Sequence, residues 1–288
     1  MTPKEFLAMQ KGRIDAYLDD YLVPEEVKPE SIHRAIRYSV FSGGKRFRAG
    51  LCIASSDLFG GDPGKVLPVA AGIELIHTYS LIHDDLPCMD DDDLRRGKPT
   101  LHKVYGENIA VLAGDALNAL AFDLVSRADD CRLIHILAGA IGTLGMIGGQ
   151  VADVESSGRD DVTEEHVRFI HTHKTAKLIE ASVRMGAVSA GAPDEGVKTV
   201  SAYGSRIGLA FQIVDDILDI ESTSEILGKT VGSDEEHEKT TFPKVFGLER
   251  SKAIAREIVS EAIGKLGNLD GDTGMLEGMA TYVIERVN

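Results

Sequence analysis

The chain has 288 residues, of which 43% are hydrophobic, and its formal net charge is −15. This length suffices for one large domain with a sizeable core or for two small domains. The negative charge excludes nucleic acid as a general partner, because both would be polyanions. An anionic ligand would therefore have to be held locally, through a metal ion or a few well-placed cations.

The cysteine spacing and the composition of the N-terminal residues bear on the cellular compartment of the protein. Cys52, Cys88 and Cys131 are far apart and form no CxxC pair, so neither a disulfide framework nor a zinc site is expected. Residues 1–13 carry four charged side chains and no apolar core, so we expect no signal peptide and a cytoplasmic protein. The most apolar stretch, 133–149, contains five glycines, and we expect a buried helix there and no stable membrane insertion.

Helical periodicity predominates along the chain, and strand patterns are nearly absent. Clusters of Gly, Pro and Asp separate the apolar stretches, and no Ser/Gly linker divides the chain. The sequence therefore predicts an all-α, single domain spanning residues 1–288, with a polar, mobile flap at 223–243. The expected helices are 2–22, 30–42, 46–59, 64–86, 105–127, 131–155, 163–191, 195–222, 250–267 and 272–286.

The first acidic cluster is Asp84-Asp85-Leu86-Pro87-Cys88-Met89-Asp90. Pro87 should end the preceding helix, which places two aspartates on its last turn and the third in the following loop. Carboxylates are unfavourable at a helix C-terminus and at this density, unless a cation lies among them. Oxygen ligands of this kind suit Mg²⁺ bridged to a phosphate. The adjoining aspartates at 91–93 are interpreted as solvated loop charges.

The second acidic cluster is Asp215-Asp216-Ile217-Leu218-Asp219, about 130 residues later. Asp215 and Asp219 are four residues apart, so they share one face of a helix, and Gln212 precedes Asp215 by one turn on that face. The flanking residues are apolar nearly all round, which indicates a buried helix. A solvated acidic face is the alternative, and the apolar neighbours disfavour it.

Cationic residues near the two clusters could hold an anion. Gly43-Gly44-Lys45-Arg46-Phe47-Arg48 begins a helix, where backbone N–H groups and basic side chains form an anion site. Arg95 and Arg96 follow the first cluster, Lys229 follows the second, and Lys174-Thr175 lies in an apolar helix. Taken singly, these lysines could be exposed surface residues, and His77 could be a hydrogen-bonded core histidine.

Together and in this order, the motifs resemble the trans-isoprenyl diphosphate synthases. The matching segments are Gly43–Arg48, Ser80–Pro87, Asp92–Thr100, Lys174-Thr175, Phe211–Asp219 and Gly228-Lys229. The resemblance runs from about residue 30 to the C-terminus. The two-residue insertion Cys88-Met89 resembles bacterial farnesyl and plant-type geranylgeranyl diphosphate synthases. Ala49 departs from the family, which often has proline there, but it is not a ligand.

The resemblance implies an isoprenoid synthase helical bundle around a central cavity, a homodimer, and three Mg²⁺ ions between the two aspartate helices. The implied metal residues are Asp84, Asp85, Asp90, Asp215, Asp216 and Asp219. An allylic diphosphate would meet Arg95, Lys174 and Lys229. Isopentenyl diphosphate would bind at Gly44, Lys45, Arg48, His77 and Arg96. The carbocation would lie near Lys174, Thr175 and Gln212.

The activity implied by the resemblance is condensation of isopentenyl diphosphate with dimethylallyl or geranyl diphosphate. Tyr79 and Ser80 would set product length, and a bulky aromatic at position 79 resembles the farnesyl type, so we expect farnesyl diphosphate. Geranylgeranyl diphosphate is the alternative product. A terpene cyclase is disfavoured because the second motif keeps its aspartates. A non-catalytic partner subunit is disfavoured because no metal-site carboxylate is missing.

Overall fold

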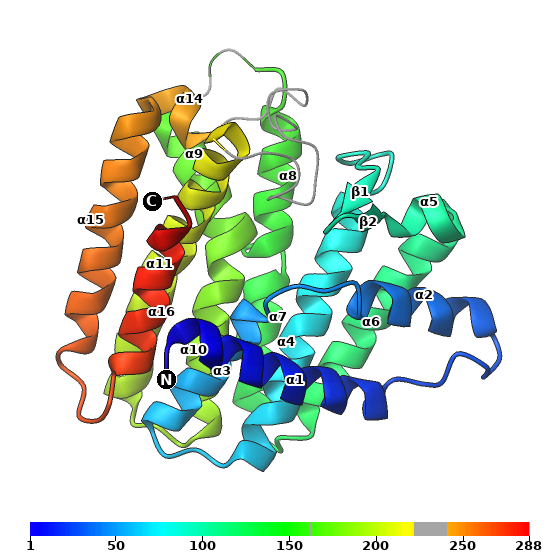
Figure 1. Ribbon diagram of the computed structural model, residues 1–288, viewed down its shortest axis with the longest axis horizontal. Coiled ribbons are helices and arrows are strands. Elements are labelled where there is room, and N and C mark those ends of the chain that lie inside the picture. Colours follow the sequence, from blue (N-terminus) through cyan, green and yellow to red (C-terminus); the bar gives the residue numbers. More distant parts are fainter. Residues whose placement is uncertain (160, 162, 222–240, 288) are drawn as a thin grey trace.

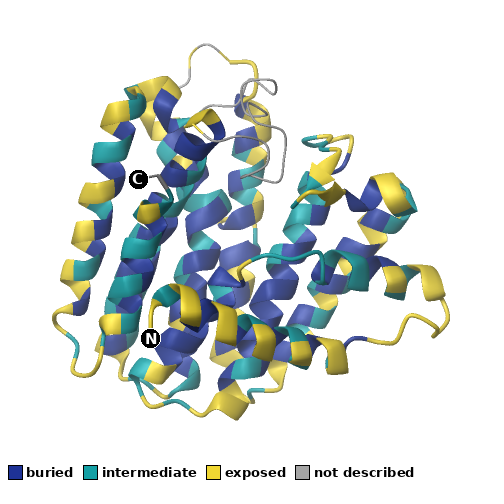
Figure 2. Cartoon of the chain, in the orientation of Figure 1, coloured by how far each residue is buried: buried dark blue, intermediate teal, exposed yellow. Residues whose placement is uncertain are grey.

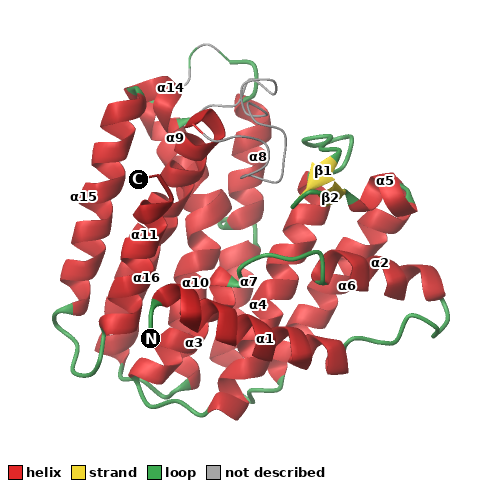
Figure 3. Ribbon diagram, viewed as in Figure 1, coloured by secondary structure: helices red, strands yellow, loops and turns green. Residues whose placement is uncertain are grey.

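The structure is a computed structural model that describes residues 1–159, 161, 163–221 and 241–287. Throughout these residues the regular structure is helical apart from one short hairpin (Figure 3), which confirms the predicted all-α fold. The α-helices are α1 Pro3–Tyr21, α2 Glu30–Val40, α3 Phe47–Leu58, α4 Pro63–Asp84, α5 Leu101–Tyr105, α6 Glu107–Ser126, α7 Cys131–Ile141, α8 Met146–Ser156, α9 Glu164–Ile170, α10 Lys177–Ser189, α11 Asp194–Glu221, α14 Phe242–Phe246, α15 Leu248–Leu266 and α16 Gly274–Ile284.

Helices α3, α4, α10 and α11 form the centre of the bundle (Figure 1). Helix α6 packs against α4 on one side, and α15 and α16 pack against α11 on the other. The buried faces of these helices point inward, whereas α15 and α2 present exposed residues outward (Figure 2). A short 3₁₀ turn, η2 Glu285–Val287, follows α16 and contacts α11, so the C-terminus returns to the helix that carries the second acidic cluster.

Local signals explain where several helices begin and end. Thr2 and Glu5 form a reciprocal capping box at the start of α1, and Pro3 occupies the first helical position. The Asp62 side chain caps α4 by accepting from Gly64 N. Helix α4 ends at Asp84, three residues before Pro87, as the sequence predicts.

The predicted helix 131–155 is two helices, α7 and α8, separated by residues 142–145. A Cβ atom on Gly145 would lie 2.1 Å from the carbonyl oxygen of Ala140, so only glycine allows this bend. The interpretation of 133–149 as a buried helix is wrong: Leu144 is 85% exposed, and apolar residues of α8 are also exposed. By length and composition alone, three stretches could cross a membrane: Pro63–Asp84, Glu107–Ser126 and Cys131–Ser156, the last divided by this bend.

Three other features differ from the sequence prediction. The expected helix 163–191 contains a π-helical turn, η1 His171–Ala176, between α9 and α10. A hairpin of two-residue strands, β1 Leu94–Arg95 and β2 Lys98–Pro99, was not predicted, because strands this short show no alternation. The short helices α5 and α14 were not predicted either. Most of the expected flap at 223–243 lies outside the described residues.

We predict that Gly186→Ala destabilises the fold. Gly186 of α10 faces α3 so closely that a Cβ atom would lie 2.0 Å from the carbonyl oxygen of Cys52. Separating these two central helices should cost about 1–3 kcal/mol of unfolding free energy, measured by urea denaturation. Gly12→Ala is the control: Gly12 lies in exposed α1 with open space around it, and this change should be neutral or slightly stabilising. Equal stability of the two variants would contradict the packing argument.

Candidate active site

A cavity of about 790 Å³ lies among α4, α8, the π-helical turn and α11. It brings together predicted site residues that are up to 168 positions apart in the sequence, from Arg48 to Asp216. The sequence-predicted residues that line it are Arg48, His77, Tyr79, Ser80, Asp84, Asp90, Arg95, Arg96, Lys174, Thr175, Gln212, Asp215 and Asp216.

Five predicted residues do not appear in that lining. Asp85 lies in a smaller adjoining pocket, and Asp219 is buried within α11. Lys45 is exposed, with its Nζ atom 5.4 Å from the ring centre of Tyr282. Gly44 lies beside it on the loop before α3. Lys229 falls outside the described residues.

The π-helical turn aims Lys174 and Thr175 into the cavity. The turn adds a residue to the helical repeat and so shifts the register of the side chains that follow. Helix α8 packs directly on this turn, because a Cβ atom on Gly149 would lie 2.1 Å from the backbone nitrogen of Lys174. The close approach of α8 therefore defines where the backbone of Lys174 lies. Sequence periodicity did not reveal this turn, because one extra residue within a continuous helical stretch leaves little periodic signal.

A chain of hydrogen bonds links the π-helical turn to the second acidic cluster. The Thr175 hydroxyl donates to Gln212 Oε1 at 2.6 Å, and Gln212 Nε2 donates to Asp216 Oδ1 at 2.9 Å. Thr175 thus has its proton engaged, which leaves its oxygen lone pairs directed elsewhere. Asp216 also accepts from the backbone N–H of Phe242 at 2.9 Å. The carboxylate is buried and ties α11 to α14, a role that the sequence did not indicate.

Lys174 forms an ion pair with Asp153 of α8, Nζ to Oδ2 at 2.6 Å. Burial lowers the pKa of Lys174, but the carboxylates of Asp84, Asp153 and Asp90 outweigh burial and the net pKa is raised. Lys174 is therefore a permanent cation, and the centre of the cavity carries a negative potential that favours positive charge. Asp153 was missed by the sequence reasoning, and its only signal was a carboxylate on an apolar helix.

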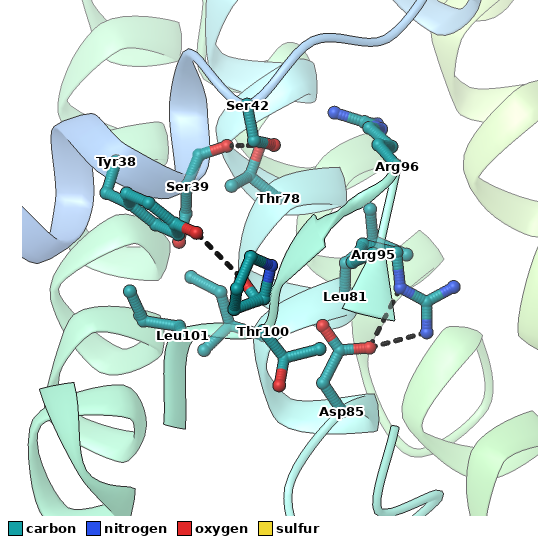
Figure 4. A pocket seen from close by; sticks show the side chains of 12 residues that line it. Tyr38, Ser39, Ser42, Thr78, Leu81, Asp85, Arg95, Arg96, Thr100 and Leu101 are labelled. Carbon is teal, nitrogen blue, oxygen red and sulfur yellow. Dashed lines mark hydrogen bonds and ion pairs between the residues drawn. The ribbon is translucent and has the colours of Figure 1, made fainter. Parts of the chain in front are cut away.

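The first acidic cluster is folded back by its loop. The backbone N–H of Asp90 donates to the carbonyl oxygen of Asp84 at 2.9 Å, so both carboxylates reach the same cavity. Asp85 accepts from Arg95 Nε at 2.8 Å in the adjoining pocket (Figure 4). Burial raises the pKa of Asp85 to about 7, although Arg95 lowers it. Asp92 also pairs with Arg95 at 2.6 Å and lines the cavity, so its interpretation as a solvated loop charge is wrong.

The β1–β2 hairpin presents Arg95 and Arg96. Its two-residue loop, Arg96-Gly97, has φ values of +55° and +73°, the left-handed conformation that tight hairpins require. Arg96 Nη1 donates to the carbonyl oxygen of Gly43 at 2.5 Å. Gly44 lies under the same guanidinium, where a Cβ atom would be 2.7 Å from Arg96 Cζ. Gly44 thus allows the close contact with Arg96, and both glycines of the pair adopt positive φ values, +110° at Gly43 and +105° at Gly44.

Arg48 and His77 form the neighbouring part of the cavity wall. Arg48 Nη1 lies 3.3 Å from His77 Nε2. Burial lowers the pKa of His77 well below its usual value, and Arg48 and Arg96 lower it further. His77 is therefore neutral near pH 7 and accepts a hydrogen bond from Arg48. His77 is thus hydrogen-bonded, as the core-histidine interpretation requires, and it also lines the cavity; its contact with a diphosphate stays a prediction.

Arg286, from the C-terminal turn η2, is a second residue that the sequence reasoning missed. Its Nη1 atom lies 2.8 Å from Asp215 Oδ1, and its guanidinium lies 4.9 Å from the ring centre of Phe211. A basic residue two positions before the last residue of the sequence gave no signal of its own. The contact shows that Asp215 holds a cation in this conformation.

Residues 29–273 match the polyprenyl synthetase family. The chain belongs to this family. Its relatives include the chloroplastic heterodimeric geranylgeranyl pyrophosphate synthase large subunit 1 of Arabidopsis thaliana, 49% identical over 91% of this chain and 74% of that protein. The chloroplastic geranylgeranyl pyrophosphate synthase of Catharanthus roseus is 45% identical over 99% and 82% of the two chains.

Solved structures of similar proteins agree with this polyprenyl synthetase fold. The geranyltransferase of Helicobacter pylori, complexed with magnesium and isoprenyl diphosphate, has a TM-score of 0.86 and 37% identity, over 99% of this chain and 97% of that one. The polyprenyl synthase of Caulobacter crescentus, complexed with calcium and isoprenyl diphosphate, has a TM-score of 0.90 and 26% identity, over 99% and 98%.

The donor set of this polyprenyl synthetase fits hard divalent cations. Carboxylate oxygens from Asp84, Asp90 and Asp215 line one cavity, and such oxygens are the ligands that Mg²⁺ prefers. Within the described ranges, no three potential metal ligands converge closely enough to hold an ion by themselves. Mg²⁺ characteristically completes its shell with water and substrate phosphates, so the incomplete protein shell suits this ion.

We predict that Asp153→Asn lowers turnover. The change removes the carboxylate that holds Lys174 Nζ and leaves a buried cation with a weaker partner, so kcat should fall by about tenfold or more. Steady-state kinetics with saturating substrates measure the effect. Glu261→Gln is the control, because Glu261 is an exposed residue of α15 that pairs with Arg206 and does not line the cavity. Equal kcat for Asp153→Asn and the wild type would show that the ion pair does not position Lys174.

Proposed function

We propose that the protein condenses isopentenyl diphosphate with an allylic diphosphate and forms farnesyl diphosphate. The observation that carries this proposal is the single cavity in which two acidic clusters meet a set of buried cations. Carboxylates and cations in one site suit a diphosphate that is bound partly through metal and partly directly. The 37% identical structure named geranyltransferase, solved with magnesium and isoprenyl diphosphate, supports the substrate class.

The two substrates are assigned to different cations. The allylic diphosphate would bind near Lys174 and Arg95, beside the carboxylates, with Asp84, Asp90 and Asp215 as residues that would hold Mg²⁺. We propose three ions, as the family resemblance implies. Isopentenyl diphosphate would bind at Arg48, Arg96 and His77, where burial and neighbouring arginines keep the imidazole neutral.

The reaction requires charge stabilisation and not a protein nucleophile. The C1–O bond of the allylic substrate breaks, and the diphosphate leaves with the electron pair. When bound, Mg²⁺ supplies positive charge to that leaving group, and Lys174 adds to it. The Thr175 oxygen faces the allylic cation while its proton is donated to Gln212. The double bond of isopentenyl diphosphate then attacks C1, and a proton from its C2 passes to the released diphosphate.

Tyr79 supports a 15-carbon product. The side chain is buried, lines the cavity and contacts the His83 ring edge-on at 5.6 Å between centres. Five residues before Asp84 on a helix correspond to roughly 7.5 Å of depth, near the end of a ten-carbon tail. Ser80 lies beside it in the lining. A tyrosine at this depth would stop the growing chain.

A 20-carbon product is the second candidate. Both plant relatives named above are geranylgeranyl pyrophosphate synthases. In addition, Val111, Ile147 and Val151 line the cavity while remaining at least 40% exposed, so the apolar end of the cavity is not sealed by the described residues. An opening there would accommodate a longer tail.

We also propose a homodimer. Large exposed apolar side chains occur on α6, on the bend before α8 and on α8, namely Val111, Leu112, Leu144, Ile147, Val151 and Val154. Such a patch marks a protein interface more often than solvent-exposed surface. The Arabidopsis thaliana relative is named as a heterodimer subunit, so a different partner chain is the alternative.

Metal removal should abolish turnover, because the diphosphate cannot leave without charge stabilisation. Chelation with EDTA should stop product formation and excess Mg²⁺ should restore it. Asp84→Ala and Asp215→Ala should each lower kcat by about 100-fold or more. Asp20→Ala, on the exposed side of α1, serves as the control and should match the wild type. Full turnover in excess chelator would refute the metal assignment.

Tyr79→Ala should lengthen the product towards 20 carbons and beyond, because it removes the ring that limits the cavity. Chromatography of the products from isopentenyl and geranyl diphosphate measures chain length. Tyr17→Ala removes a partly buried tyrosine elsewhere in the core and should leave the distribution unchanged. A wild-type protein that accumulates the 20-carbon product would reject the farnesyl assignment in favour of the second candidate.

The double variant Leu112→Glu/Leu144→Glu should dissociate the proposed dimer. Two carboxylates in an apolar interface would carry a large desolvation cost, and neither residue lines the cavity. Light scattering coupled to size-exclusion chromatography gives the mass of each species. A wild-type protein with the mass of a single chain would contradict the homodimer.

A further inference from the structure

Arg46 lies within the basic segment before α3, yet its environment differs from that of its neighbours. Lys45 is exposed and Arg48 lines the cavity, whereas Arg46 is only 2% exposed and is not among the residues that line the cavity. Its position in the motif suggests a diphosphate ligand. Its burial points to a different role.

The Arg46 guanidinium connects three helices. Its Nε atom donates to Asp15 Oδ1 of α1 at 2.8 Å, and its Nη2 atom donates to the carbonyl oxygen of Val40, the last residue of α2, at 2.6 Å. Its Nη1 atom lies 3.5 Å from Glu74 Oε2 of α4. All three nitrogens are thus directed away from the cavity and into the protein.

The backbone of Arg46 is held in an unfavourable conformation. Arg46 is the N-cap of α3 and has φ of +52°, in the left-handed region. For a residue with a Cβ atom this conformation is unfavourable, because the Cβ atom comes too close to the following carbonyl oxygen. The contacts of the guanidinium offset that cost, so the side chain of Arg46 specifies the turn that places Arg48 on the first turn of α3.

Glu74 links Arg46 to the backbone beside Arg48, which lines the cavity. Its Oε1 atom accepts from the backbone N–H of Ala49 at 3.1 Å, while Oε2 approaches Arg46. Ala49 follows Arg48 directly, and Glu74 precedes His77 by three residues on the same face of α4. The Arg46–Glu74 contact therefore determines how Arg48 meets His77, at 3.3 Å.

We propose that Arg46 is a positioning residue for the isopentenyl diphosphate subsite. It touches no substrate and acts through the turn and through Glu74, which together set the separation of Arg48 and His77. This inference rests on the proposed assignment of that subsite. Asp15 of α1 accepts a hydrogen bond from the Arg46 guanidinium, so it also contributes to the position of Arg48, although it does not line the cavity.

Arg46→Lys is the first test, because lysine keeps the charge and the same backbone preference but lacks the planar fork that bonds three partners. KM for isopentenyl diphosphate should rise by about tenfold, while kcat and KM for geranyl diphosphate should change by less than about twofold. If Arg46 were simply another cation attracting the diphosphate, lysine would leave both KM values unchanged.

Asp15→Asn is the second test and applies even if Arg46→Lys folds poorly. This variant should raise KM for isopentenyl diphosphate although Asp15 is not among the described residues that line the cavity. The double variant should be no worse than the more affected single variant, because both changes disrupt one contact. Tyr203→Phe is the stability control: it removes a buried hydroxyl that donates to Leu276 O at 2.6 Å, remote from the cavity, and should lower Tm without altering either KM.

The outcomes distinguish the positioning role of Arg46 from the proposed isopentenyl diphosphate subsite on which it rests. Lower Tm with an unchanged KM for isopentenyl diphosphate in both Arg46→Lys and Asp15→Asn, as in the control, would overturn the positioning role. Arg48→Ala tests the subsite itself and should raise the same KM. If Arg48→Ala leaves that KM unchanged, the subsite assignment fails. If Arg48→Ala raises it and the two other variants do not, only the role of Arg46 fails.

Discussion

Charge compensation around one cavity is the constraint on which the rest of this structure depends. Carboxylates from α4, from its following loop and from α11 meet in a largely apolar bundle, where each would be costly without a cation. The fold supplies cations from distant segments: Arg95 from the hairpin reaches Asp85, Lys174 from the π-helical turn reaches Asp153, and Arg286 from the C-terminus reaches Asp215. The positive charges that compensate these carboxylates therefore come from the hairpin, the π-helical turn and the C-terminal turn.

The same arrangement explains how a strongly acidic protein can bind anionic substrates. Carboxylates raise the pKa of Lys174 in spite of its burial, so it is positive at all working pH values. Around Arg48, Arg96 and His77 the opposite balance holds, because burial lowers the pKa values of all three groups. Neighbouring arginines lower the pKa values of Arg96 and His77 further. The cavity thus has a carboxylate-rich side that favours metal and a cation-rich side that favours a bare diphosphate. This asymmetry is the reason for the proposed assignment of the allylic diphosphate to the carboxylate-rich side and of isopentenyl diphosphate to the cation-rich side.

The sequence predicted most of the helices, the all-α fold and thirteen of the residues that line the cavity, because apolar periodicity and clustered charges are local signals. It missed features that depend on packing. At the π-helical turn, α8 approaches Lys174 through Gly149, a contact between residues 25 positions apart. The break between α7 and α8 and the two-residue strands left no periodic pattern. Arg286 was missed because its contact with Asp215 depends on where the C-terminal turn packs. Asp92 was misinterpreted because the sequence alone does not distinguish an aspartate paired with Arg95 from a solvated one.

The central claim is that the protein carboxylates and a diphosphate complete one metal site together. Titration calorimetry of Mg²⁺ with and without inorganic pyrophosphate tests it directly, without any turnover. Mg²⁺ should bind weakly to the protein alone, because no three ligands converge among the described residues. The affinity for Mg²⁺ should rise by at least about tenfold when pyrophosphate is present, and Asp84→Ala should abolish that increase. Tight Mg²⁺ binding without pyrophosphate, or pyrophosphate binding that is independent of Mg²⁺, would contradict it.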